Sequence, residues 1–149
     1  LSLPELLIVL AVLGIAAALA VPGFSGLVDL YNLKKATRQL VTDLQSAKMR
    51  AVAEGVEHRV TLFPGRAPRY IVERQTGSGW APVDTMRSLA DPANPHYAKG
   101  ITMTTESDPL RVVFSPLGSA NPPASVLFRS PTNQAKTVRI ILTGRIRIE

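Results

Sequence analysis

The stretch LSLPELLIVLAVLGIAAALAVPGF, residues 1–24, decides the fold, because it is an apolar segment that carries a single carboxylate, Glu5. No other side chain between Leu1 and Val28 is charged. An ionised carboxylate without a counter-ion costs much free energy in an apolar setting. The segment therefore raises the question of what neutralises Glu5, since its own neighbours in the sequence supply no basic side chain.

The apolar segment is long enough to enter or cross a membrane as a helix. At about 1.5 Å per residue, residues 1–28 would extend about 42 Å, and the unbroken run Leu6–Val21 about 24 Å. A cleaved signal peptide is the alternative, and Ala18-Leu19-Ala20 is similar to a small-residue cleavage site. The sequence shows no initiating Met and no basic region before the apolar run. We therefore expect a membrane helix rather than a cleaved signal peptide.

The rest of the chain has a different composition. From Asp29 onward, 17 Lys and Arg less 10 Asp and Glu leave a net charge of +7. A basic chain favours an anionic partner or surface, such as nucleic acid or lipid head groups. Cysteine is absent, which excludes disulfides and thiolate sites. We therefore divide the 149 residues into an apolar helix, residues 1–28, and a charged head, residues 29–149.

Just after the apolar span, which ends at Val28, the sequence has three basic residues, Lys34, Lys35 and Arg38. By the positive-inside rule alone they would hold the head in the cytoplasm. Only a basic leader upstream of Leu1, removed during maturation, would outweigh them. We expect such a leader in the precursor if the head lies outside the cytoplasm.

The segment from Leu27 to Glu54 has the periodicity of an amphipathic helix that ends at Gly55. Its apolar residues recur at spacings of three and four: Leu33, Ala36, Leu40, Leu44, Ala47 and Ala51. Such a stripe predicts the surface on which a head domain packs.

After Gly55 the pattern becomes that of short strands separated by turns, which predicts an α+β fold with a mainly antiparallel sheet. The expected strands are residues 56–63, 69–74, 101–104, 110–115, 125–129 and 136–142, and residues 88–98 are expected to be irregular.

No catalytic or metal-binding motif is present in the sequence. His58 and His96 are the only histidines, and neither lies in a metal-ligand spacing. Gly77-Ser78-Gly79 lacks the context of a phosphate loop. The sequence therefore predicts a protein that is not an enzyme and that has no metal or cofactor.

The N-terminal segment resembles the start of a processed type IV pilin or type II secretion pseudopilin, on the strength of Ser2, Leu3, Glu5, the aliphatic run, Gly14 and Pro22. Three further segments, residues 36–55, 112–118 and 137–149, are similar to the GspH/FimT branch of minor pseudopilins and minor pilins. The resemblance implies a pilin-like fold, in which a long N-terminal helix, kinked near Pro22, packs on the β-sheet head.

The resemblance also implies a function and a maturation pathway. The chain would be a structural subunit of a type IV pilus-like filament or type II secretion pseudopilus, and its partners would be other pilin or pseudopilin subunits. It would be stored as a single-pass inner-membrane protein with its head in the periplasm, then moved into a periplasmic or cell-surface filament. A leader peptidase/N-methylase would cut before Leu1 and methylate its amine.

The resemblance offers an answer for Glu5, which would pair with the free N-terminal amine of a neighbouring subunit. Such a pair fixes the register, because a misplaced subunit would leave a buried charge unneutralised. The alternative is a carboxylate that reaches the interface or becomes protonated. Gly14 and the nearby alanines would let neighbouring helices approach closely.

The C-terminal sequence TGRIRIE is a candidate nucleic-acid site. In a strand, Arg145 and Arg147 would share one face about 7 Å apart, which is comparable to the spacing of phosphates along a nucleic-acid strand. Gly144, Arg145, Ile146 and Arg147 match the Gly-Arg-x-Arg element of FimT-like minor pilins that bind DNA for uptake. The resemblance therefore implies an alternative function, the capture of double-stranded DNA through phosphate contacts in natural transformation.

Two points about this tail remain open from the sequence. Lys136 and Arg139 would extend the basic patch if the strand register allows it. A two-residue turn at Thr143-Gly144 would place Ile140 opposite Arg147, so we expect a bulge or a longer loop. The alternative to a DNA site is the solvent face of an edge strand, where arginine discourages unwanted pairing.

Overall fold

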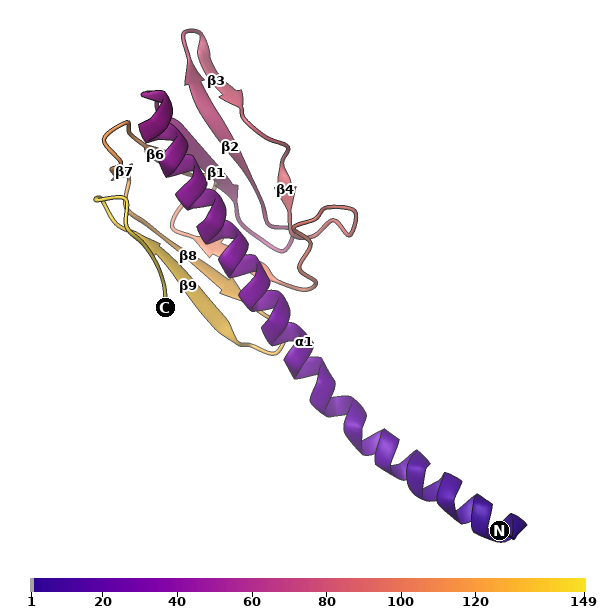
Figure 1. Ribbon diagram of the computed structural model, residues 1–149. Coiled ribbons are helices and arrows are strands. Elements are labelled where there is room, and N and C mark those ends of the chain that lie inside the picture. The colour runs from indigo at the N-terminus through magenta and orange to yellow at the C-terminus, as the bar shows by residue number, and fades with distance from the viewer. Residues whose placement is uncertain (1) are drawn as a thin grey trace.

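The computed structural model describes residues 2–149, with the side chains of residues 2–19 and 24–149. One long helix, α1 (Leu3–Glu54), leaves a β-rich head and projects well beyond it (Figure 1). The strands of the head are β1 (His58–Phe63), β2 (Arg69–Thr76), β3 (Gly79–Pro82), β4 (Arg87–Ser88), β5 (Thr102–Thr105), β6 (Leu110–Phe114), β7 (Ala120–Asn121), β8 (Ala124–Arg129), β9 (Ala135–Ile140) and β10 (Ile146–Ile148).

Helix α1 runs for 52 residues, so the apolar segment and the amphipathic segment form one element. It ends as predicted at Gly55, which adopts the left-handed conformation (φ 68°) and donates its N–H to the Ala51 carbonyl at 3.1 Å. Glycine suits that position because it has no Cβ to clash there. The predicted kink near Pro22 stays a prediction, because the side chains of residues 20–23 lie outside the described part of the chain.

The strands form two sheets, and every strand pair in the described residues is antiparallel, which confirms the predicted sheet type. One sheet has the order β3-β2-β1-β6-β7, with β4 also paired to β2, and the other has the order β10-β9-β8-β5. The C-terminal half of α1 lies across both sheets (Figure 1). The head is therefore two sheets joined through one helix.

The apolar stripe of α1 forms the centre of the core. All six residues of the predicted stripe are at most 1% exposed. They pack with the inward residues of both sheets, among them Tyr70, Phe114 and Phe128. Truncating a buried leucine to alanine costs about 2–5 kcal/mol, so this half of α1 is an integral part of the head rather than a stalk attached to it.

A polar cluster around Asp43 also fastens α1 to the first sheet. Asp43 Oδ2 accepts hydrogen bonds from the Tyr70 hydroxyl at 2.8 Å and from Arg87 Nε at 2.9 Å. Arg87 Nη2 in turn donates to Asp84 at 2.8 Å. Burial, together with the Asp43 carboxylate, raises the pKa of Tyr70 far above its ordinary value, so the hydroxyl remains a donor. The cluster joins α1, β2 and β4 through one carboxylate.

Three short strands were not predicted from the sequence. Strand β3 follows the Gly77-Ser78 turn, β4 has two residues and begins just before the predicted irregular segment, and β7 pairs with the end of β6. The six strands with predicted bounds, β1, β2, β5, β6, β8 and β9, each begin and end within two residues of them.

Candidate functional site

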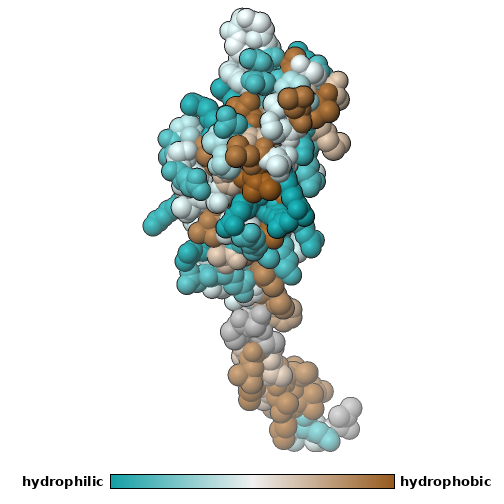
Figure 2. All heavy atoms as spheres, turned by 90° about the vertical axis from the view of Figure 1, so that its left-hand side faces the viewer, coloured by the Kyte–Doolittle hydropathy of each residue, from teal (hydrophilic) through white to brown (hydrophobic). Residues whose placement is uncertain are grey.

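The N-terminal half of α1 is an apolar surface that the head does not cover. Its most apolar stretch of 18 residues contains no buried residue. By length and composition this helix could cross a membrane. Leu6, Ile8, Leu13 and Ile15 are each more than half exposed. Figure 2 shows this half as a hydrophobic stalk below a mixed, largely hydrophilic head. An apolar surface of this extent marks a membrane or protein contact.

Glu5 lies in the first turn of this stalk, where it has a local partner that the sequence reasoning missed. The backbone N–H of Ser2 donates to Glu5 Oε2 at 3.3 Å, in a capping-box arrangement. The spacing Ser2-x-x-Glu5 was the available signal for it. A backbone N–H is no counter-ion, and Glu5 forms no ion pair with any residue from 2 to 149 whose side chain is described.

Two other predicted assembly residues fall outside the described part, namely Leu1 and the side chain of Pro22. Gly14 is described, and a Cβ added to it would meet no atom within 4 Å. Its surface is therefore open in the single chain, as close approach by another helix would require.

The C-terminal hairpin has the longer loop that was predicted. Strand β10 pairs with β9 so that Ile146 lies opposite Ile140 and Arg147 opposite Arg139. Five residues, 141–145, connect the two strands, and the Ile141 N–H donates to the Arg145 carbonyl at 3.1 Å. The three residues between that pair form the turn, and the last of them, Gly144, has φ 71°. A three-residue loop with glycine in the left-handed conformation is a common hairpin connection.

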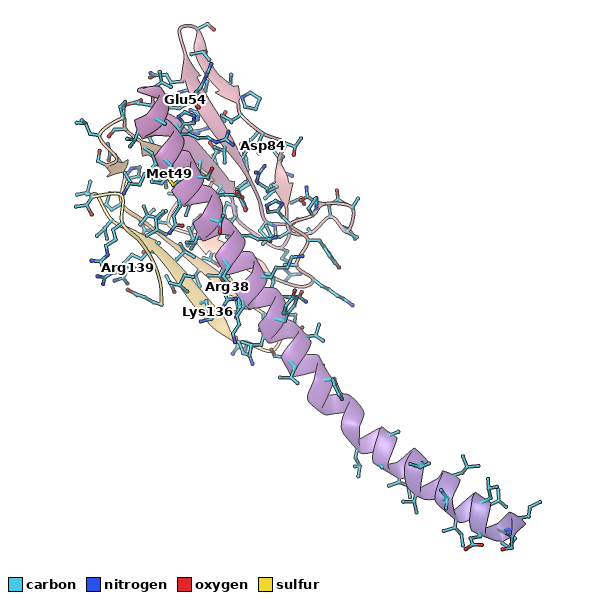
Figure 3. The ribbon with its side chains drawn as sticks, in the orientation of Figure 1. Arg38, Met49, Glu54, Asp84, Lys136 and Arg139 are labelled. Atoms are coloured by element: carbon cyan, nitrogen blue, oxygen red, sulfur yellow. The ribbon has the colours of Figure 1, made fainter. Side chains whose placement is uncertain are left out.

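This register brings Arg147 and Arg139 together and separates them from Lys136. The two arginines are cross-strand partners on the solvent face of the sheet, and Arg145 follows on the same side. Arg139 Nη2 also pairs with Glu149 at 3.2 Å. Lys136 differs from Arg139 by three positions, so it lies on the opposite face, which covers α1. The register therefore allows Arg139, and not Lys136, to extend the basic patch (Figure 3).

Gly144 has a structural role that the sequence motif did not reveal. A Cβ at Gly144 would overlap the carbonyl oxygen of Gly118, because the β9–β10 loop crosses the β6–β7 turn in direct backbone contact. Lys48 Nζ donates to the Gly144 carbonyl at 3.0 Å, and the Ala120 N–H donates to the Leu142 carbonyl at 2.9 Å. The loop that carries Arg145 is thus held by α1 and by β7.

The histidines do not form a metal site among the described residues. His58 is fully buried, and its Nδ1 lies 3.2 Å from the Val56 carbonyl. His96 lies 3.5 Å from Asp43, and burial lowers the pKa of His96, so it is mainly neutral at pH 7. Both side chains therefore belong to the packing of the head.

An ion pair on β1 and β2 makes the head sensitive to acid. Arg59 donates to both Glu73 oxygens, at 2.7 and 3.0 Å, and Thr61 Oγ1 donates to Oε2 at 2.8 Å. These hydrogen bonds, that of Arg59 above all, hold the pKa of Glu73 below its ordinary value of 4.5. A carboxyl group whose pKa is lower in the folded state than in the unfolded state stabilises the folded protein at pH values above its unfolded-state pKa. That stabilisation is lost as the pH falls through the folded-state pKa.

We therefore expect Glu73→Gln to flatten the acid dependence of the free energy of unfolding. Wild type should lose stability as the pH falls from about 5 to about 3, and the variant should lose less over the same range. Asp84, whose pKa Arg87 lowers, should keep part of the dependence in both proteins. Denaturant titrations of both proteins at pH 5 and at pH 3 measure the free energy of unfolding. An equal loss of that free energy between the two pH values in both proteins would contradict the prediction.

No curated protein sequence matches the chain. Its fold is similar to that of the minor pseudopilin EpsH from the type 2 secretion system of Vibrio cholerae, with 14% identity, a TM-score of 0.63, and coverage of 79% of this chain and 96% of that one. It is also similar to the type IV minor pilin FimU of Pseudomonas aeruginosa, with 18% identity, a TM-score of 0.59, and coverage of 78% and 92%. The pilin-like α+β fold predicted from the sequence is confirmed.

A family model described as type II transport protein GspH matches residues 36–144. The match begins within the buried half of α1 and ends at Gly144, so it covers most of that half and strands β1 to β9. The description names a transport protein rather than an enzyme, in agreement with the prediction from the sequence. Since the matched residues make up more than half of the sequence, the chain belongs to the GspH family of type II transport proteins.

Proposed function

We propose that the chain is a structural subunit of a type IV pilus-like or type II secretion pseudopilus filament, which assembles from the inner membrane by packing of its N-terminal helix. The observation that carries the proposal is a single helix with two unlike halves: the C-terminal half is buried in the head, and the N-terminal half is apolar and uncovered. A surface of that kind is stable only against lipid or against other apolar helices.

The proposal accounts for both environments of the stalk. Before assembly the stalk crosses the inner membrane, with the head in the periplasm, after a leader peptidase/N-methylase has acted before Leu1. After assembly the stalk packs among the stalks of other subunits in a periplasmic or cell-surface filament. Gly14 leaves an open surface for that packing, and Glu5 pairs with the terminal amine of a neighbour.

The test compares two variants, one with a lysine on the apolar half of α1 and one with a lysine on the head. We expect Leu13→Lys to remove the full-length chain from both the membrane and the filament fractions of producing cells. A lysine near the centre of an apolar span costs about 3 kcal/mol, which corresponds to a loss of roughly a hundredfold. The matched control is Leu117→Lys on the β6–β7 turn, where the leucine is 95% exposed. Equal recovery of the two variants in both fractions would contradict the proposal.

A second candidate function is DNA binding by the outer face of β9 and β10. The observation that favours it is the register that sets Arg147 beside Arg139, with Arg145 following on the same side. Guanidinium groups suit phosphate oxygens, and aromatic side chains for base stacking are lacking on these two strands. Binding of this kind follows the phosphates of double-stranded DNA and depends little on sequence. Arg145 and Arg147 lie beyond the residues that the family model matches.

For this second function, we expect Arg139→Ala combined with Arg147→Ala to lower the salt dependence of DNA binding. Removing one phosphate contact reduces the slope of log K against log salt by about 0.9, so the slope of the double variant should fall by about 1.8. The full-length chain in detergent and a labelled duplex are sufficient for the measurement. Arg66→Ala combined with Arg111→Ala removes the same charge from other exposed positions. An equal change in both double variants would exclude the tail as the site.

A further inference from the structure

We propose that Lys34, Arg38 and Lys136 form a binding site for the phosphate headgroup of an anionic phospholipid while the chain is stored in a membrane. The three side chains line one cleft of about 130 Å³, together with Thr37 and Ile148. The inference rests on the proposed function, because the cleft meets a bilayer only if the N-terminal half of α1 is inserted in it.

The cleft lies at the height of the lipid headgroups. The exposed apolar surface of α1 continues to Tyr31, which is 68% exposed, and tyrosine is typical of the membrane interface. Lys34 and Arg38 follow Tyr31 by about 4.5 and 10.5 Å along the axis. The headgroup layer is about 5–7 Å thick on each side, and long helical side chains lean toward the N-terminus, here toward the membrane. Both cations therefore reach that layer.

The sheet supplies the third cation. Lys136 lies on the face of β9 that covers α1, and it meets Arg38 where α1 leaves the head (Figure 3). The acid at the end of β10, Glu149, pairs with Arg139, which points away from α1. A helix and a strand that are distant in the sequence thus bring cations to one cleft.

The charges of this cleft are not neutralised within the described part of the chain. None of Lys34, Arg38 and Lys136 forms an ion pair with a described residue, Asp29 on the same helix included. Lys35 differs, because its Nζ donates to the Tyr97 carbonyl at 2.9 Å. Three like charges at one cleft repel one another unless an anion lies among them.

The chemistry of the cleft suits a phosphate on a lipid. The guanidinium of Arg38 can donate two parallel hydrogen bonds to phosphate oxygens, and the two ammonium groups add point charges. Thr37 is not a ligand, because its hydroxyl donates to the Leu33 carbonyl at 2.7 Å. Ile148 gives the cleft an apolar wall on which the glycerol end of a lipid can lie. Cations next to a membrane span are also attracted by the negative potential of anionic lipids.

The test uses the full-length chain in nanodiscs, with spin-labelled phosphatidylglycerol and phosphatidylcholine as the probes. We expect the chain to associate with phosphatidylglycerol more strongly than with phosphatidylcholine. Removing each cation should reduce that preference roughly fivefold, so Arg38→Gln combined with Lys136→Gln should reduce it about 25-fold. The matched control, Arg50→Gln combined with Arg74→Gln, removes two charges from exposed positions nearer the other end of α1 and should keep the preference.

The outcomes separate this inference from the proposed function. Failure of the wild-type chain to enter nanodiscs would overturn both. Insertion without a preference for phosphatidylglycerol, or an equal loss in the two double variants, would overturn the lipid site alone. In discs of phosphatidylcholine, inorganic phosphate should shift the amide signals of Thr37 and Lys136 only weakly. Saturable binding of phosphate there, as tight as that of the lipid, would assign the cleft to a soluble phosphate and overturn the lipid assignment.

Discussion

Gly144→Ala is expected to destabilise the head by about 2–5 kcal/mol, because the added Cβ brings both a conformational cost and a steric cost. The backbone of Gly144 has φ 71°, a conformation that costs a residue with a Cβ roughly 1–2 kcal/mol. The added Cβ would also overlap the Gly118 carbonyl, and overpacking of this kind costs about 1–3 kcal/mol or more. The neighbouring contact is backbone, so it cannot move aside as a side chain would.

Two other glycines separate these costs. Gly55 has φ 68° but no atom within 4 Å of an added Cβ, so Gly55→Ala should show the conformational cost alone. Gly77 has neither feature, and Gly77→Ala should change the free energy of unfolding by less than about 0.5 kcal/mol. Denaturant titration of the three variants should rank them Gly144, Gly55, Gly77. If Gly144→Ala is no more destabilising than Gly55→Ala, the described contact between the two loops is wrong.

Glu5→Gln is expected to reduce incorporation of the chain into filaments roughly a hundredfold or more. Removing one partner of a buried ion pair costs about 3–5 kcal/mol, because the other charge is left uncompensated. Here the uncompensated charge would be the terminal amine of a neighbouring subunit. The amount of chain in sheared or purified filaments, relative to the amount in the membrane, measures the effect.

Glutamine is the informative replacement because it keeps the local role of Glu5. A Gln at this position still accepts the hydrogen bond from the Ser2 N–H, so the capping box is preserved while the charge is lost. Glu5→Ala removes both. If Glu5→Gln assembles like wild type and only Glu5→Ala fails, the residue acts as a helix cap, and the pairing with another chain is refuted.

Periodicity was sufficient to predict the elements that form the core. The spacing of Leu33, Leu40 and Leu44 predicted the buried face of α1, and alternation predicted the long strands, because these elements each bury one continuous face. Strands β4 and β7 have two residues each, too few to show any period. Their existence depends on pairing with longer strands, which the local sequence does not encode.

The contacts between distant segments could not be predicted for the same reason. Asp43 interrupts the apolar stripe of α1, three residues after Leu40 and four before Ala47. An acid on that face signals a largely buried carboxylate, but its partners Tyr70 and Arg87 come from other elements. The separation of Lys136 from Arg139 follows from alternation along β9. The approach of Arg147 to Arg139 depends on the three-residue turn, and the sequence predicted a bulge or a longer loop without fixing the register.

The most direct measurement is a density map of the native filament at side-chain resolution. The proposed function predicts that the N-terminal halves of α1 pack together at the filament axis, with the Glu5 carboxylate within ion-pair distance of the terminal amine of a neighbouring chain. A map in which Glu5 faces water, or in which the apolar half of α1 folds against its own head, would contradict it.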